Sequence, residues 1–485
     1  MIQKTLLATL VLAAITGCTV GPDYQGAPQV AGKTLAAGRL AHDQPARPDA
    51  PPAAQWWHSL GDAQLDTLVN QALAHSPTLA EAEARLRQSR AGLASEQAAG
   101  RPKVSANATM LRMRSPDVSQ FAGGEGGGGG RGPLSLYLAD FDASWEVDLF
   151  GGTRRAIEAA DASAAASAAQ LADAQVQLAA EVVQAYVDLR DRQQRLALVD
   201  ASSELEQQVL ELTRQRRSRG VASELQLEQV ITQADTTRSQ RLPLQAQIVE
   251  SLDQLALLCG QEPGELDAQL QASAALPSVP AQVPLADPAA MLKARPDIRA
   301  AERQLASANA QIGEKTADWF PKLSLLGDLG FSAADPGHLA RKDNATWLLV
   351  PRLTWNALDF GRVKASVEGA EAGRDLALAQ YRGTVLQALR DADSALVRYG
   401  HQRESVVLLR GIQASAERAA ELTRQRYRAG TASTLDWLDA ERTRFDAQQN
   451  RVAGDAQLLK DFAALHKSLG LGWDDAGSSR ELQRL

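Results

Sequence analysis

The chain has 485 residues, enough for two or three ordinary domains; hydrophobic residues make up 45% of it and aromatic residues only 5%. A composition rich in alanine and leucine with so few aromatic rings is typical of long helices packed through small side chains, and it argues against one thick globular core. The formal net charge of −7 argues against a nucleic-acid partner, because phosphate binding requires a basic surface.

The N-terminal segment 1–17 has the features of an export signal. Lys4 supplies a positive charge, an apolar stretch runs from Leu6 to Ile15, and small residues lead to Cys18. The apolar stretch is too short for a permanent membrane helix. A cysteine in this place resembles a bacterial lipoprotein signal, which implies a covalent lipid on Cys18, and Thr19 after it permits sorting to the outer membrane. The alternative is an ordinary signal peptide followed by a chance cysteine.

The remainder of the chain repeats itself. HSPTLAEAEARLRQSRAGL (75–93) corresponds to 294–312 and GRPKVSANA (100–108) to 319–327, both at an offset of 219. DLFGG (148–152) corresponds to 358–362 and LLCG (257–260) to 467–470, both at an offset of 210. The difference is absorbed between the strands of the first copy, where GGEGGGGGRGP (123–133) lies. Agreement of separate blocks indicates an internal duplication.

The repeat divides the chain into six parts, each repeat reading helix, strand, loop, strand, long helix, turn, helix. In order they are a signal peptide (1–17), an extended N-terminal segment (18–62), repeat one (63–260), a proline-rich linker (261–290), repeat two (291–470) and a C-terminal tail (471–485).

Each repeat contains two segments with the period of a strand, at about 103–112 and 134–148 and at about 322–331 and 346–356. In 134–148, apolar residues alternate with an acidic set: Asp140, Asp142, Glu146 and Asp148. Strands of about ten residues with such alternation are typical of a transmembrane β-barrel. Four tryptophans lie in or beside these segments, as an interfacial aromatic belt requires: Trp145, Trp319, Trp347 and Trp355. Taken singly, each segment also fits an ordinary half-buried sheet.

Four strands are too few to close a barrel, since about eight are needed to leave room for side chains inside. An open sheet edge in lipid leaves backbone groups unpaired at a cost of several kcal/mol each. If these strands enter a membrane, several chains therefore share one barrel, and its acidic inner face favours cations at the exit. The glycine run at 126–130 fits an external loop of such a barrel and no phosphate site.

Long helices are predicted from Thr153 to about Arg217, a length of about 95 Å at ~1.5 Å per residue, and from Val363 to Tyr427. Return helices follow at about 224–258, where Pro243 is expected to bend or break the helix, and at 435–469. Heptad spacing indicates coiled-coil packing at two sets of positions: Val182, Leu189 and Leu196; Leu438, Phe445, Val452 and Leu459. Helices with so thin an apolar stripe need lateral partners. Cys259, at the end of the first return helix, is expected to be a buried and unreactive thiol.

The turn between the helices is written twice, as LTRQRRSRGVAS (212–223) and LTRQRYRAGTAS (422–433). Gly220 and Gly430 suit the left-handed residue that closes a helix, and Ser223 and Ser433 suit the cap of the next helix. The arginines around each turn fit dipole compensation. The functional alternative is a docking surface at the tip of each helical hairpin, made of Arg217, Gly220, Val221, Ser223, Tyr427, Arg428, Gly430, Thr431 and Ser433.

The sequence resembles the outer membrane factors of bacterial tripartite efflux pumps, the TolC-like exit ducts, in their lipoprotein (NodT-type) branch. The resemblance rests on GCTVGPDY (17–24), the WW at 56–57 with LGDAQLDTLVNQAL (60–73), the proline-bounded strand starts and RYRAGTASTLDWLDAERTRF (426–445). It implies a homotrimer: a twelve-stranded β-barrel in the outer membrane, continued by a long α-helical tunnel through the periplasm, with an equatorial girdle from the N-terminal, linker and C-terminal segments.

The resemblance also implies a periplasmic gate on the helix after the second turn, at Leu435, Asp436, Asp439 and Arg442. Three copies would make stacked rings of carboxylates with Arg442 as compensating charge. The plain reading of these residues is a solvated helix face with an i,i+3 ion pair. Gln226 and Gln229 stand at the positions of Asp436 and Asp439 in the first copy, so acidic rings are expected from the second copy alone.

The expected function is an exit duct that passes drugs or other small molecules, with a periplasmic adaptor and an inner-membrane transporter of the resistance-nodulation-division type as partners. The alternatives are a duct for type I protein secretion and a periplasmic coiled-coil lipoprotein without a pore. No enzyme is expected, because nucleophile and phosphate motifs are missing from the sequence, and no metal or other cofactor, because the six histidines are scattered.

Overall fold

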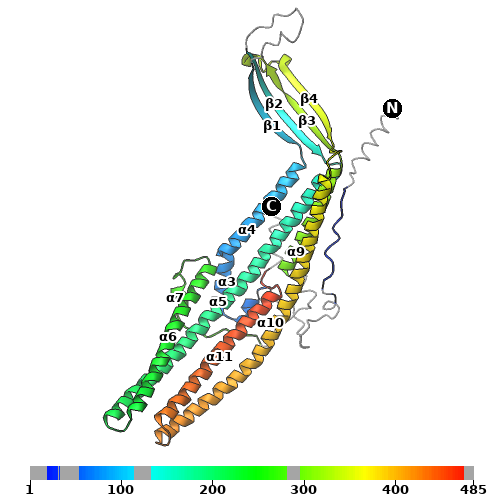
Figure 1. Cartoon of the computed structure of the whole chain (residues 1–485). Coiled ribbons are helices and arrows are strands. Elements are labelled where there is room, and N and C mark those ends of the chain that lie inside the picture. Colours follow the sequence, from blue (N-terminus) through cyan, green and yellow to red (C-terminus); the bar gives the residue numbers. More distant parts are fainter. Residues whose placement is uncertain (1–18, 31, 33–53, 114–132, 281–294, 474–485) are drawn as a thin grey trace, which may run out of the picture. The chain divides into compact units, whose positions relative to one another are not determined.

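The computed structural model describes residues 19–30, 32, 54–113, 133–280 and 295–473 (Figure 1). The chain forms two compact units. Unit 1 contains residues 1–27, 87–166 and 301–380, and unit 2 contains residues 28–86, 167–300 and 381–485. Each unit takes segments from both repeats, as expected when duplicated elements pack beside each other. Cys18 and the glycine run at 126–130 lie outside the described residues.

Unit 1 contains one antiparallel sheet in the order β1 (Lys103–Met113), β2 (Leu134–Val147), β3 (Lys322–Ala333) and β4 (Ala345–Thr354) (Figure 1). The β1–β2 hairpin places Lys103 opposite Ser144, and the β3–β4 hairpin places Lys322 opposite Thr354, its counterpart in the repeat. Within the described residues, β1 and β4 each pair with a strand on one side only. The sheet therefore presents two open edges.

The helices are as long as the sequence predicted. The long helices α5 (Gly152–Ser218) and α10 (Arg362–Arg428) have 67 residues each, and the return helices α6 (Glu224–Leu258) and α11 (Thr434–Ser468) have 35 each. Shorter helices are α3 (Ala63–His75), α4 (Pro77–Ala99), α7 (Asp267–Leu270) and α9 (Pro296–Thr316). Single-turn 3₁₀ helices complete the described secondary structure: η1 (Trp56–Leu60), η2 (Ala317–Trp319), η3 (Pro336–His338) and η4 (Lys342–Asn344). The expected fold class, long helices with four strands per chain, is confirmed.

The core of unit 2 is a layer of small, aliphatic and aromatic side chains between the helices. Leu438, Phe445, Val452 and Leu459 are all buried along α11, as the heptad spacing predicted. In α5, Val182 and Leu189 are buried and Leu196 is half-buried. Buried alanines of α5, including Ala179 and Ala180, let neighbouring helices approach closely. Cys259 is buried at the end of α6, and burial raises the pKa of its thiol to about 11, which keeps it unreactive.

Pro243 does not break α6, contrary to one of the two effects expected of it. The helix is continuous from Glu224 to Leu258. Pro243 and the residues before it, Ser239 to Leu242, are exposed, so water can bind the carbonyl that loses its N–H partner.

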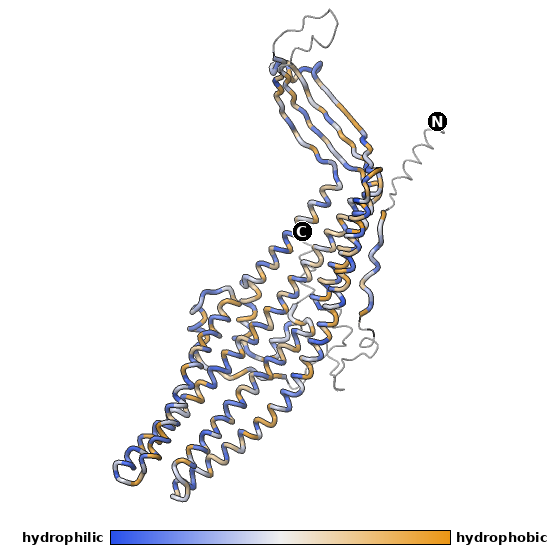
Figure 2. The backbone as a smooth tube through the Cα atoms, viewed as in Figure 1, coloured by the Kyte–Doolittle hydropathy of each residue, from blue (hydrophilic) through white to orange (hydrophobic). Residues whose placement is uncertain are grey.

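Hydrophobic and hydrophilic residues alternate at short range along the helices (Figure 2). Accordingly, no helix in the described part of the chain combines the length and apolarity that crossing a membrane requires.

Candidate functional site

Acidic side chains meet on one face of the sheet. The β2–β3 register places Asp142 opposite Asp328, with Asp140 one side-chain step away on the same face. Carboxylate oxygens of Asp140, Asp142 and Asp328 lie within 4.8 Å of one another, and Asn107 on β1 donates a hydrogen bond of 2.5 Å to Asp142. Glu146 lies further along the same face, because it shares the even-numbered alternation of β2. Carboxylates so close together repel each other and attract cations.

Asp148 was wrongly predicted to be a strand residue. It follows the end of β2 at Val147, and its carboxylate accepts hydrogen bonds from the backbone N–H (3.0 Å) and the side chain (3.1 Å) of Arg154, in the first turn of α5. A helix start leaves N–H groups without intrahelical partners, and a nearby carboxylate satisfies one of them. In copy two Asp359 does the same for α10 by accepting from Gly361 and Val363, and these bonds lower the pKa of Asp359.

Asp328 was not predicted, although its signal was present. Leu323, Leu325, Leu329 and Phe331 stand at odd-numbered positions of β3, so the even-numbered Asp328 belongs to the opposite face, with the acids of β2.

The two helical turns in unit 2 have the predicted local geometry. Gly220 and Gly430 have φ of 74° and 76°, in the left-handed region. Val221 N–H donates to the Arg216 carbonyl and Thr431 N–H to the Arg426 carbonyl, both at 2.9 Å. These bonds satisfy the last carbonyls of α5 and α10 and turn the chain sharply.

Capping boxes begin both return helices. Ser223 exchanges hydrogen bonds with Gln226, and Ser433 exchanges them with Asp436 at 3.0 and 2.9 Å. Asp436, predicted as a gate residue, is therefore also the capping residue of α11. Hydrogen bonds from Ser433, first of all its backbone N–H, lower the pKa of Asp436.

The other predicted gate residues lie on the same helix. Asp439 and Arg442 form an ion pair of 2.7 Å between exposed side chains. Leu435 is half-buried and packs with Trp437 against a small cluster of Val209, Leu210, Val230, Ala234 and Leu438. The four positions predicted for the gate thus lie on the first turns of α11, and Leu435 belongs to the packing between the hairpins.

The turn residues of the two hairpins touch each other. The Arg216 guanidinium donates to the Tyr427 hydroxyl (3.3 Å) and to Thr434 (3.2 Å), and the Tyr427 ring stacks on Trp437 with centroids 4.9 Å apart. Arg217 forms an ion pair with Glu224 across its own turn. Arg428, Ser223 and Ser433 lie at the hairpin ends as predicted. Arg216 was predicted only as one of the arginines that surround the first turn, and Trp437 was not predicted as a site residue.

The sequence profile of the outer membrane efflux protein family matches residues 68–261 and 288–471, which is most of the chain. The chain belongs to the outer membrane efflux protein family. It is 30% identical to the outer membrane protein OprJ of Pseudomonas aeruginosa and to the antibiotic efflux pump outer membrane protein ArpC of Pseudomonas putida, in each case over 97% of this chain and 96% of the relative.

Solved structures of such channels match the fold of this efflux protein. The outer-membrane channel OprN is 34% identical with a TM-score of 0.81, covering 94% of this chain and all of that one. The CmeC outer membrane channel of Campylobacter jejuni shares the fold at 20% identity, with a TM-score of 0.86 over 96% of this chain and 98% of that one. This efflux protein is therefore an outer membrane channel component of a Gram-negative bacterium that extends into the periplasm.

The residues after Cys18 are fixed to unit 1 of the efflux protein. Val20 N–H donates to the Phe150 carbonyl (3.1 Å), and Asn309 donates to the Pro22 carbonyl (2.9 Å). The buried Arg155 side chain donates to the Val20 carbonyl (3.1 Å) and to Asp23 (2.6 Å). Sequence reasoning missed Arg155, because these partners lie far from it along the chain.

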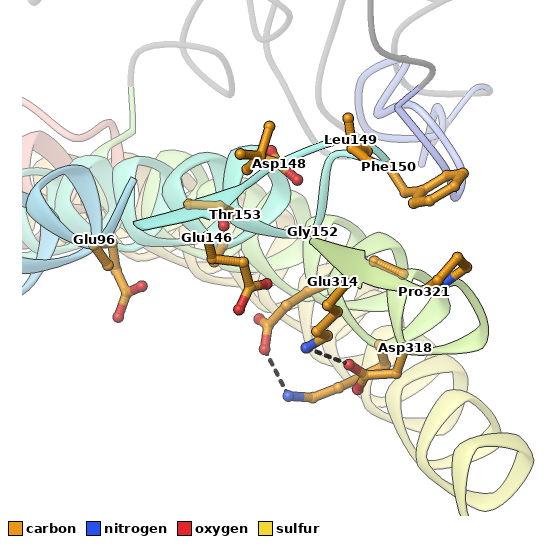
Figure 3. Close-up of a pocket in the computed structure, with 16 residues that line it drawn as sticks. Glu96, Glu146, Asp148, Leu149, Phe150, Gly152, Thr153, Glu314, Asp318 and Pro321 are labelled. Carbon is orange, nitrogen blue, oxygen red and sulfur yellow. Dashed lines mark hydrogen bonds and ion pairs between the residues drawn. The ribbon is translucent and has the colours of Figure 1, made fainter. Parts of the chain in front are cut away.

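A cavity of about 330 Å³ lies in unit 1 of the efflux protein, where α4, β2 and α9 end and α5 begins (Figure 3). Two ion pairs, Glu314 with Lys315 (2.6 Å) and Asp318 with Lys322 (2.9 Å), form part of its wall. The lining also contains three further carboxylates, those of Glu96, Glu146 and Asp148 (Figure 3). Carboxylates outnumber lysines in this lining, so the acidic character of the sheet face continues to the cavity.

Proposed function

We propose that three copies of this chain form one exit duct of a tripartite efflux pump, which passes small molecules from the periplasm to the exterior. The observation that carries the proposal is the four-stranded sheet with open edges at β1 and β4 in a chain of this family. Open edges are not stable in lipid. Three copies contribute twelve strands, more than the roughly eight that a barrel with an interior requires.

The acidic face of the sheet, with Asp140, Asp142, Glu146 and Asp328, lines the inside of this barrel and makes it favour cations. On α11, Leu435, Asp436, Asp439 and Arg442 form the periplasmic gate, where three symmetry-related carboxylates at each acidic position narrow the passage. The capping role of Asp436 supports this placement, because the capping box fixes its backbone position at the helix start.

The turns at Gly220 and Gly430 contact the helical hairpins of a periplasmic adaptor, and an inner-membrane transporter of the resistance-nodulation-division type supplies the energy. Support comes from the exposed tips, where Val221 is 71% exposed. Leu225, in the first turn of α6, is 67% exposed as well, and two exposed apolar side chains at one tip suit contact with a protein partner.

A lipid on Cys18 adds membrane affinity at about 0.8 kcal/mol per buried methylene. The fixed segment from Val20 to Asp23 supports this, because it ties the residues next to Cys18 to the unit that carries the sheet.

The cargo is proposed to be drugs or other small molecules. Relatives are named for antibiotic efflux, toluene efflux and pyoverdine export, which favours efflux over protein secretion.

The proposal is tested by deleting the gene and by recording currents from the purified protein in planar bilayers. Increased sensitivity to small toxic compounds, restored by the gene in trans, together with discrete single-channel currents, is the expected result. Loss of a secreted protein without a change in compound sensitivity would identify a secretion duct, and absence of current would identify a scaffold without a pore.

A further inference from the structure

The offsets of the repeat hold at the level of single hydrogen bonds. Trp145, at the end of β2, donates from its indole to the Gly100 carbonyl (3.1 Å), and Trp355, at the end of β4, donates to the Trp319 carbonyl (3.0 Å). Trp355 corresponds to Trp145 at the offset of 210, and Trp319 corresponds to Gly100 at the offset of 219. Lys103 pairs with Ser144 in the first copy, and their counterparts at offsets of 219 and 210, Lys322 and Thr354, pair in the second copy.

One contact of copy one has no counterpart within the described part of the chain. The loop after β2 places Phe150 on Phe320, at the start of β3, with stacked rings whose centroids lie 4.6 Å apart. The corresponding loop of copy two, after β4, leaves Phe360 exposed to solvent. Phe360 is 96% exposed and Leu358 is 83% exposed. β3 is the next strand of the sheet after β2, whereas β4 is followed by no strand among the described residues.

The repeat identifies what should cover Phe360. At the offset of 219, the copy-one counterpart of Phe320 is Arg101, which lies two residues before the start of β1. Within one chain, β1 lies at the opposite edge of the sheet from β4. The β1 that Phe360 needs therefore belongs to a second copy of the chain.

We propose that Phe360 packs on the Gly100–Pro102 segment of the partner subunit, and that β4 pairs with the partner's β1 in the register of β2 with β3. This inference rests on the proposed function and specifies its subunit interface. Applying the two offsets of the repeat to the observed pair of Ser144 and Leu326 places Thr354 opposite Asn107 of the partner subunit. In the contact itself, the guanidinium of Arg101 of the partner subunit lies over the Phe360 ring, a cation–π pair in place of the two stacked rings.

Cysteine cross-linking in outer membranes tests the register. The variant Thr354→Cys/Asn107→Cys is oxidised and compared with Thr354→Cys/Thr109→Cys, which is displaced by two positions on the same face and too far apart for a disulfide. Ser144→Cys/Leu326→Cys is the matched pair within one chain, read out by loss of thiol labelling. Cys259 is buried and does not compete.

The expected result is a ladder of covalent dimers and trimers from Thr354→Cys/Asn107→Cys alone. A ladder from Thr354→Cys/Thr109→Cys instead overturns the register. No ladder from either pair, while the matched pair within one chain is oxidised, overturns the pairing of β4 with β1. Native mass and bilayer current, measured on the same preparations, distinguish a failure of this inference from a failure of the proposed function. A conducting trimer without these cross-links refutes only this inference. A monomer without current refutes the proposed function.

Phe360 is tested in the same background. Phe360→Ala is expected to lower the cross-linking yield of Thr354→Cys/Asn107→Cys at least threefold, and Phe360→Trp is expected to retain it, because a larger ring still accepts the guanidinium. Equal yields for Phe360→Ala and the parent overturn the contact.

Discussion

Asp436 caps a helix within one chain and, in the proposed trimer, also belongs to a ring of carboxylates. Its carboxylate caps α11, and the hydrogen bonds from Ser433 lower its pKa, so it is ionised at neutral pH. Truncation to alanine would remove the charge and the cap together. Copy one supplies the better substitution, because Gln226 makes the same capping box without a charge.

We therefore predict that Asp436→Gln/Asp439→Gln raises single-channel conductance severalfold and abolishes block by multivalent cations, while the helix cap is retained. Conductance is measured in planar bilayers with and without a trivalent cation. Glu228→Gln, an exposed carboxylate on the first turns of α6, is the control for lost charge. Unchanged conductance and unchanged block in Asp436→Gln/Asp439→Gln would rule out the carboxylate rings.

His466 is a second residue with a calculable effect. It is 4% exposed in the core of unit 2, its ring stacks on Trp56 with centroids 5.0 Å apart, and its Nδ1 lies 2.9 Å from the Phe462 carbonyl. Burial lowers the pKa of His466 to about 4. The folded protein therefore holds the neutral ring, while the unfolded chain binds a proton below its ordinary pKa of about 6.5.

The contribution of neutral His466 to the free energy of unfolding is accordingly present above pH 6.5 and is lost as the pH falls toward 4. Relative to His466→Phe, which keeps an aromatic ring but does not titrate, the wild type should lose about 2 kcal/mol between pH 7 and pH 5. Denaturant unfolding of both proteins at the two pH values measures the difference. Parallel pH dependence of the two proteins would show that His466 does not titrate in this range.

At the scale of elements, η1 anchors the segment that precedes α3 to the core of unit 2. Trp56 and Trp57 are both about 1% exposed, and Trp56 lies edge-on to Phe462, with centroids 5.7 Å apart, besides stacking on His466. The element η1 is too short to be stable as an isolated helix, so packing of these rings holds it in place.

Trp56→Ala should therefore destabilise unit 2 by about 3–5 kcal/mol through the cavity it leaves. Trp56→Phe should recover about half of that loss, because a smaller ring still fills part of the site. Thermal unfolding followed by circular dichroism checks both variants. A decrease in the free energy of unfolding below about 1 kcal/mol for Trp56→Ala would show that η1 does not anchor this segment.

Hydrogen bonds within each hairpin turn set its local geometry. Val221→Asp changes the exposed tip without touching Gly220 or the Ser223 cap, and it should lower export at least tenfold at an unchanged amount of protein in the membrane. Gln240→Glu, on the exposed part of α6, adds the same charge away from the tip. Normal export by Val221→Asp would remove the turns from the docking surface.

The sequence predicted features that depend on neighbouring residues and failed where the contacts join residues far apart in the chain. The left-handed glycines and the serine caps follow from neighbouring residues alone and were predicted correctly. Asp148 was misassigned because strand alternation and helix capping compete for the same carboxylate, and the α5 start decides the outcome. Arg155 was missed, since nothing near it in the sequence indicates that Val20 and Asp23 lie against it.

At the scale of the whole molecule, duplication gives two helical hairpins of equal length, with 67 and 35 residues in the helices of each, and it leaves the sheet with two unlike edges. One edge carries β1 with Gly100–Pro102, and the other carries β4 with the exposed Phe360 loop. Edges that differ in this way join head to tail, and head-to-tail joining closes into a ring when the rotation per copy allows it. The proposed hollow axis shared by several copies requires two edges that differ in this way.

The most direct test is the native mass of the detergent-extracted protein. The account predicts a complex of three chains, each near the 51.8 kDa of the full sequence less the predicted signal peptide and plus any lipid. A protein found only as single chains, at any concentration and in any mild detergent, would contradict it.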